Sequence, residues 1–491
     1  LFRKFTLSHK FTKTLNTSYT KTIDSNLDQF KADKIEILRT MNPGMVKGRS
    51  EKITTNYSPD FVKWLSPTIS YSPNYTWSLN LNQADTIRSA NVKSSNSFKT
   101  QLKLSITELI ELIYTPENSR KSSRGRGRSS SRATNNAKKI NIQNPIARYI
   151  IGKFHFLSSK LSAINSTYTY TTSHDYNNIN SDEHISYLYR FGLQELPIDT
   201  TNISLFDNNN PSNNSRTSKY GNDISIKSNL NLTRSIVTSL NFDYSNALNI
   251  PSMTSRSYTE SFSFYPLGTR GDQGFPISNW SINWSGLEKW WIMDKIFRSI
   301  SLNHGFNGEY SSNSKDENND GKILKDELQY EQYNLNYSPI IGITTKTIGR
   351  SPITFKTNFN YSQNIKNTNA NTIRNHNSQI SGSISYRKSG GLTIPLFFFR
   401  DFYINNDIDF SLNFSWDKDQ ELQTSTVVDN LSDFNEHSKN MTWSIKPNVT
   451  YNFTRWIHGT FYFMYGMSEN KTSGKNEERD FGFTMNIKIQ G

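Results

Sequence analysis

The stretch Phe481-Gly482-Phe483-Thr484-Met485-Asn486-Ile487-Lys488-Ile489-Gln490 alternates large apolar residues with small or polar ones. Such alternation is typical of a β-strand with one apolar and one polar face, because successive side chains of a strand point to opposite sides. About nine to eleven residues is also the length at which a tilted strand crosses a lipid bilayer. The stretch therefore predicts a membrane-crossing β-strand.

The same two-residue period recurs upstream in runs that are separated by polar segments. The clearest runs are residues 69–81, 353–361, 408–416 and 441–453. Pro73 and Pro447 lie inside two of them, and we expect bulges or strand ends there, because proline cannot donate a backbone hydrogen bond. Several runs exceed ten residues, whereas the strands of a soluble β-sandwich or β-solenoid, which is the alternative, are usually shorter.

The composition agrees with strands that have two different faces. Only 34% of the 491 residues are hydrophobic, yet 13% are aromatic, and the net charge is +14. A soluble globule needs more apolar residues for its core, and disordered chains are poor in aromatics. We therefore expect an all-β fold, an antiparallel transmembrane β-barrel wall with small helical insertions, which is apolar toward lipid and polar toward its lumen.

The connections between the runs differ in length. Long polar connections are predicted at residues 468–479, 417–440, 364–377 and 311–326, and short ones at 454–456, 342–351 and 231–236. Outer-membrane barrels have short periplasmic turns and long external loops. The pattern thus predicts that the short turns and the end of the chain lie on the periplasmic side. The side of residues 105–160 and 194–221 stays open.

Three segments lack the two-residue period. Residues 106–114, 145–157 and 286–297 have helical spacing, and Trp290 and Trp291 suit either a membrane-interface anchor or packing on a neighbouring domain. The expected organisation is strands over 1–104, a helical and Arg/Ser-rich insertion over 105–160, and strands over 161–491. Residues 119–132 suit contact with anionic lipid, lipopolysaccharide or nucleic acid. We interpret them as a solvated flexible insertion and expect no nucleic-acid partner, because no stacking aromatics are interleaved.

Residues 316–327 match the twelve-residue calcium-loop pattern. Gly321 stands at the sharp turn of that pattern. The oxygen ligands would come from Asp316, Asn318, Asp320, the Lys322 carbonyl and Glu327. The following residues read as a strand rather than as the exiting helix of such a site, so a solvated acidic loop is the alternative. Calcium is thus a possible ligand, and no other cofactor is expected.

No catalytic motif stands out, and we expect that the protein is not an enzyme. The sequence contains no Walker loop, G-x-S-x-G or HExxH motif, and the absence of cysteine excludes disulfides and thiolate metal sites. No apolar run is long enough for a transmembrane helix, and the first residues do not read as a signal peptide. Because an outer-membrane protein needs an export signal, we expect a C-terminal fragment of a longer chain.

A series of segments, from about residue 140 onward, resembles the SprA (Sov) family in the same order. The segments are Asn144-Pro145 before a helical stretch, residues 162–168 (SAINSTY), 187–193 (YLYRFGL), 276–280 (PISNW), 284–289 (WSGLEK), 301–305 (SLNHG) and 480–489 (DFGFTMNIKI). The Arg/Ser-rich insertion and the calcium-like loop depart from that pattern.

The resemblance implies a protein-conducting outer-membrane translocon of the type nine secretion system, which also serves gliding motility in Bacteroidota and related Gram-negative bacteria. It implies that the wall is part of a very large barrel, a passive conduit for folded cargo and motility adhesins. The implied partners are secreted cargo proteins, plug and shuttle proteins of the secretion machinery, and outer-membrane lipid and lipopolysaccharide. The alternatives are another large barrel, such as a lipopolysaccharide-assembly protein or a receptor-type transporter, and a secreted β-rich adhesin.

Overall fold

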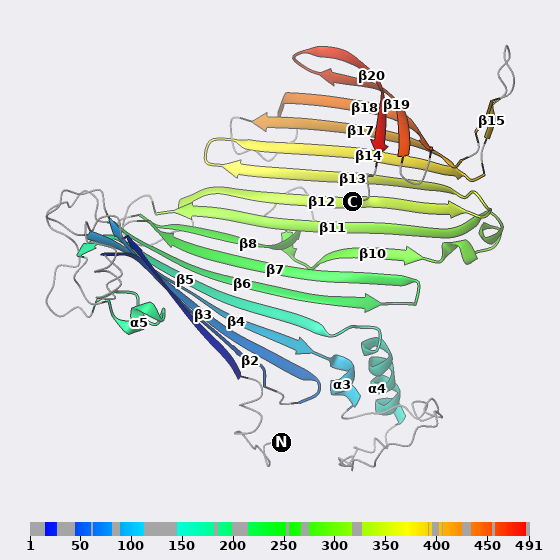
Figure 1. Cartoon of the computed structure of the whole chain (residues 1–491). Helices are drawn as coiled ribbons and strands as arrows, with labels where there is room; N and C mark the ends of the chain where they lie inside the picture. The colour runs from blue at the N-terminus through cyan, green and yellow to red at the C-terminus, as the bar shows by residue number, and fades with distance from the viewer. Residues whose placement is uncertain are drawn as a thin grey trace, which may run out of the picture. The chain divides into compact units, whose positions relative to one another are not determined.

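Long antiparallel β-strands dominate the structure, a computed structural model of the chain (Figure 1). It describes residues 15–26, 45–59, 62–80, 89–111, 145–180, 185–198, 215–251, 255–266, 274–316, 327–390, 392–394, 402–404, 406–424, 434–453 and 457–487. This confirms the predicted all-β antiparallel class with few helical segments. Among these residues, no helix is both long and apolar enough to cross a membrane.

The strands are mostly longer than ten residues. They are β1 (Leu15–Asn26), β2 (Met45–Tyr57), β3 (Leu65–Asn80), β4 (Ser89–Leu104), β5 (Ile164–Asn180), β6 (Ser215–Asn231), β7 (Ile236–Ile250), β8 (Ser257–Pro266), β9 (Gly274–Pro276), β10 (Asn279–Ser285), β11 (Phe297–Lys315), β12 (Leu328–Thr347), β13 (Ile353–Thr368), β14 (Thr372–Lys388), β15 (Leu392–Ile394), β16 (Phe402–Ile404), β17 (Ile408–Thr424), β18 (Asn435–Asn452), β19 (Ile457–Asn470) and β20 (Gly474–Ile487). The runs predicted from residues 69, 353, 408 and 441 onward all lie in strands.

The contacts within the chain divide it into two units. The first unit is Leu1–Ser228, Phe242–Ser261 and Asn313–Leu328, and the second is Asn229–Asn241, Phe262–Ser312 and Gln329–Gly491. In the first unit, β1 to β6 pair in chain order. In the second, β12, β13, β14, β17, β18, β19 and β20 pair in chain order.

Both prolines that interrupt the alternating pattern coincide with broken pairing on one side of their strand. Pro73 remains opposite Asn96 of β4, but the β2–β3 pairing is interrupted beside it. Pro447 remains opposite Leu412 of β17, and the β18–β19 pairing is interrupted beside it. This confirms the expected irregularities, because a proline lacks the N–H that one of its two neighbours would need.

Two of the predicted long loops are wrong. Within 364–377, β13 runs on to Thr368 and β14 starts at Thr372, and within 468–479, only three residues separate Asn470 from Gly474. Gly474 has a φ of +75°, a left-handed conformation that suits glycine in a tight turn. The polar residues of these segments continue the antiparallel pairing up to Asn367 opposite Thr372 and Asn470 opposite Gly474. At these two connections, the length of the loop therefore does not distinguish the predicted external end of the strands from the predicted periplasmic end.

The helical segments are short. The structure confirms a helix α4 (Pro145–Ser158) and gives α3 (Ile106–Glu111) within the segment predicted at 106–114. Residues 286–297 form two 3-10 turns, η4 (Leu287–Lys289) and η5 (Met293–Lys295), instead of the expected single helix. The reason is local, since Trp291 between the two turns has a φ of +46°, which no right-handed helix contains.

Candidate functional site

One face of the second unit is apolar and remains exposed. Directly opposite residues of neighbouring strands share a face, and Phe355, Ile384 and Leu412 lie opposite one another across β13, β14 and β17. Phe414 and Ile445 form the next such pair, across β17 and β18. All five side chains are exposed, although a soluble protein would cover so large an apolar surface.

The same face continues to β20. Phe461 lies opposite Phe483, and Phe481, Phe483, Met485 and Ile487 occupy alternate positions of β20, each more than half exposed. This confirms the alternation that the sequence shows in this strand as far as Ile487. Ile489 lies outside the described residues.

Aromatic side chains mark both ends of this apolar band. At one end Trp416 lies opposite Trp443, and at the other Ile408 lies opposite Tyr451. The nine residues from Ile408 to Trp416 span about 26 Å at roughly 3.3 Å per residue. Transmembrane barrels have an apolar band about 25 Å tall with aromatic girdles at both edges. The band in β17 thus has the length and the edges of a membrane-crossing surface.

The opposite face of the same strands is polar. Ser385, Ser411 and Asn448 lie opposite one another across β14, β17 and β18. Two rows further along that face, beyond Asn413 and Lys446, the hydroxyl groups of Ser415 and Ser444 are 2.8 Å apart and hydrogen-bonded. Small hydroxyl and amide side chains at these positions make a surface that water can wet.

The polar face carries a ladder of asparagines that ends in acidic residues. Asn334, Asn364, Asn375 and Glu421 follow one another across β12, β13, β14 and β17. The Asn364 amide donates to the Asn334 carbonyl. An open hollow of about 400 Å³ lies over this ladder. No group of three His, Cys, Asp or Glu residues suited to a metal ion occurs in the described part of the chain. The hollow is a polar surface feature.

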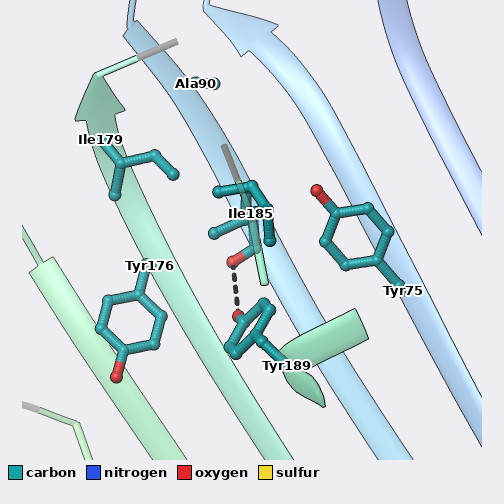
Figure 2. Packing of buried hydrophobic residues seen from close by; sticks show 7 residues of the cluster. Tyr75, Ala90, Tyr176, Ile179, Ile185 and Tyr189 are labelled. Carbon is teal, nitrogen blue, oxygen red and sulfur yellow. Dashed lines mark hydrogen bonds between the residues drawn. The ribbon is translucent and has the colours of Figure 1, made fainter. Parts of the chain in front are cut away.

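In the first unit, residues 185–198 fold back over one face of β3, β4 and β5; we call them the docked segment (Figure 2). The short helix α5 (Tyr187–Arg190) begins after Ser186, whose side chain accepts a hydrogen bond from the Leu188 N–H. Tyr189 is fully buried between Tyr75 and Tyr176, and its hydroxyl donates to the His174 carbonyl at 2.8 Å. Burial raises the pKa of Tyr189, so this hydroxyl stays a donor.

Backbone carbonyls and one ion pair hold the docked segment in place. Ser94 donates to the Tyr189 carbonyl at 2.7 Å, and Asn96 donates to the Gly192 carbonyl at 2.6 Å. Arg190 donates through Nε to a Glu51 carboxylate oxygen at 2.9 Å, with both side chains nearly buried. Burial opposes the charge of Arg190, but the Glu51 carboxylate keeps the pKa of Arg190 above its usual value.

The helices of the predicted insertion lie together at one end of β4 and β5 (Figure 1). Thr107 of α3 donates to the Ser158 carbonyl of α4 at 2.7 Å. Helix α4 leaves Tyr149, Phe154 and Phe156 exposed. The Arg/Ser-rich residues 119–132 between the helices lie outside the described residues.

The calcium-like loop is described only at its ends. Asp316 and Glu327 are both buried, and the Asp316 N–H donates to the Arg256 carbonyl at 3.0 Å. Asn318, Asp320 and Lys322 lie outside the described residues. Calcium binding therefore stays a prediction.

Sequence reasoning missed the role of the docked segment. Its residues 187–193 stood out only through a family resemblance, and nothing in them indicated that Tyr189 would be the most buried aromatic of the segment. A usable signal in the sequence was the glycine at position 192. Gly192 has a φ of +70°, and a Cβ at this position would lie 2.5 Å from the Asn96 amide nitrogen. Such a glycine marks a close approach of two chain segments.

Comparisons with known proteins give a distant structural likeness. No family model matches the chain, and no curated protein matches it. Among solved structures, it is similar to the outer membrane transporter YddB from Escherichia coli, with 8% sequence identity and a TM-score of 0.34. The match covers 93% of this chain and 60% of the transporter chain, so this chain spans less than two thirds of that neighbour. A likeness at this level does not establish a shared function.

Proposed function

We propose that this chain is part of the wall of a large β-barrel in the outer membrane of a Gram-negative bacterium. The observation that supports the proposal is the contrast between the two faces of β13, β14, β17 and β18. One face carries the apolar band of about 26 Å at roughly 3.3 Å per residue, in which Leu412 and Phe414 are exposed. The other face carries serines and asparagines. A bilayer stabilises the first face, whereas a water-filled lumen hydrates the second.

We further propose that the barrel is a passive protein-conducting translocon of the type nine secretion system. The support for this finer role is the ordered resemblance of residues 140–489 to the SprA (Sov) family. In that role, the serine and asparagine side chains line the path and bind water rather than cargo. Secreted proteins would be the cargo, and plug and shuttle proteins would close the path and receive what passes.

Depletion of the full-length protein in its native host tests the secretion role. We expect that secreted cargo proteins accumulate inside the cell envelope while lipopolysaccharide still reaches the cell surface. Loss of surface lipopolysaccharide with normal secretion would favour a lipopolysaccharide-assembly barrel. Loss of uptake of one nutrient would favour a receptor-type transporter. Recovery of the protein in the culture medium would favour a secreted adhesin.

Neighbouring residues of β17 provide a matched test of the membrane placement. Phe414→Lys places a charge on the apolar band, and Ser415→Lys places the same charge on the polar face. A lysine facing lipid destabilises a barrel by about 2–4 kcal/mol at the bilayer midplane and by about 0–1 kcal/mol at the interfaces, and Phe414 lies between these depths. We expect less folded Phe414→Lys protein in the outer-membrane fraction and near-normal amounts of Ser415→Lys. Equal amounts of the two variants would contradict the placement.

A further inference from the structure

A second exposed apolar surface lies at one strand end of the second unit, around η4 and η5. It combines aromatic and aliphatic side chains with basic ones; we call it the tryptophan rim. Its apolar members are Leu232, Trp290, Trp291, Ile292, Met293, Ile296 and Ile348, and its basic members are Arg234, Lys289, Lys295, Arg298 and Arg350, all exposed.

Hydrogen bonds join three separate chain segments into this one surface. The Ser285 N–H donates to the Ser235 carbonyl at 2.8 Å, which ties β10 to the turn at residues 231–236. The Ile348 N–H donates to the Ile296 carbonyl at 3.0 Å, which ties the β12–β13 turn to η5. The rim is therefore a defined part of the fold.

The tryptophan rim packs on the face of the sheet that carries the apolar band. Contacting rings run along this face from Trp280 through Phe306 and Tyr337 to Tyr361 of β13. The ring of Trp290 packs edge-to-face on Trp284 of β10, with centroids 5.3 Å apart. Trp284 lies opposite Leu302 and shares its face with Trp280 and Phe306, whose rings are stacked. Beyond this contact, Trp290 is 59% exposed and Trp291 is 89% exposed. Tryptophans at the edge of a lipid-facing band suit the headgroup region of a bilayer.

The charge of the rim is positive. In the described part of the chain, no salt bridge engages Arg234, Lys295, Arg298 or Arg350. Of the nearby carboxylates, Glu288 already accepts a hydrogen bond from the Ile300 N–H at 3.0 Å. These cations are thus available to an anion beside the indole rings.

We propose that the tryptophan rim binds the headgroups of anionic phospholipids and seats this strand end at the membrane surface. The inference rests on the proposed membrane placement. A phospholipid fits better than a protein partner, because the rim packs on the face that carries the lipid-facing band and its cations match phosphate. A phospholipid is favoured over lipopolysaccharide, because the rim includes two short connections, between β6 and β7 and between β12 and β13, and the short turns of outer-membrane barrels lie on the periplasmic side. Basic residues near an anionic membrane each add to the attraction.

Fluorescence quenching by brominated lipids tests the proposal. The full-length protein is reconstituted into vesicles that contain brominated phosphatidylcholine or brominated phosphatidylglycerol. The fluorescence of the wild type minus that of the Trp290→Phe/Trp291→Phe variant gives the signal of the two rim tryptophans. We expect phosphatidylglycerol to be enriched about fivefold over phosphatidylcholine there, as one headgroup–cation attraction predicts.

Charge variants identify the cause of that preference. Lys289→Gln/Lys295→Gln/Arg298→Gln should lose the preference for phosphatidylglycerol while phosphatidylcholine still quenches the rim. The matched control Lys471→Gln/Lys475→Gln removes charges at the β19–β20 turn and should keep the preference. Added lipopolysaccharide that displaces phosphatidylglycerol from the rim would overturn the assignment to phospholipid.

Two outcomes distinguish a failure of the rim proposal from a failure of the proposed membrane placement. Trp416→Phe/Trp443→Phe isolates the signal of the apolar band by the same subtraction. If lipid quenches the band but not the rim, or quenches the rim equally from both lipids, the rim proposal is wrong and the membrane wall stands. If neither signal is quenched, the proposed membrane placement fails, and the rim proposal fails with it.

Discussion

The docked segment and the tryptophan rim differ in the exposure of their aromatic residues. Both contain short helical turns and a residue at positive φ, and both pack on a strand through an aromatic ring, Tyr189 on Tyr75 and Trp290 on Trp284. The docked segment buries Tyr189 completely, whereas the rim leaves Trp291 89% exposed. The difference fits the proposed function, in which the membrane surface surrounds the rim, whereas the docked segment packs against the strands of its own unit.

Truncating the central aromatic residue of each segment sharpens this comparison most. Tyr189→Ala removes a fully buried ring and should lower the free energy of opening of residues 185–198 by about 3–5 kcal/mol. Trp291→Ala should change the opening of its own segment by less than about 0.5 kcal/mol, because an exposed side chain loses few contacts. Hydrogen exchange of the two segments measures both values. Similar changes in the two segments would break the comparison.

The Arg190–Glu51 pair gives the next largest effect. Arg190→Gln leaves the Glu51 carboxylate nearly buried without its cation, which should destabilise the docked segment by about 3 kcal/mol. Adding Glu51→Gln removes the uncompensated charge, so the double variant should recover part of the loss. Protease resistance of residues 185–198 reports both steps. If the destabilisation of the double variant equals the sum of the destabilisations of the two single variants, the Arg190–Glu51 pair does not stabilise the docked segment.

The smallest effect concerns the hydrogen bond from the Ile300 N–H to the Glu288 carboxylate, beside the tryptophan rim. The Ile300 N–H bond to the carboxylate holds the pKa of Glu288 below its ordinary value of 4.5. A lowered folded-state pKa stabilises the fold above the unfolded-state pKa, and that contribution is lost as the pH falls through the folded-state pKa. We expect the Ile300 amide to be protected at neutral pH and to lose protection below about pH 4.5. Glu288→Gln should remove this pH dependence, and an unchanged profile in that variant would exclude Glu288 as the cause.

The strands were predictable from the sequence because an apolar face opposite a polar face gives the residues a period of two. The period at 408–416 and 441–453 located β17 and β18, and Pro73 and Pro447 located two interruptions in pairing. The hairpins at Thr368 and Asn470 were not predictable in this way, because polar side chains on both faces produce no apolar alternation. The docked segment was missed because its contacts join residues as far apart as Glu51 and Arg190.

The lengths of the strands have a consequence for any molecule that moves along the polar face. The 17 residues of β17 extend over about 53 Å at roughly 3.3 Å per residue. The apolar band takes up only the first half of that distance, from Ile408 to Trp416. In the proposed translocon, a polypeptide that follows β17 would therefore stay in contact with the protein for roughly as long a stretch again beyond the lipid. Under that proposal the passage is a tunnel with a protruding vestibule, and Glu421 at the acidic end of the asparagine ladder lies within that vestibule.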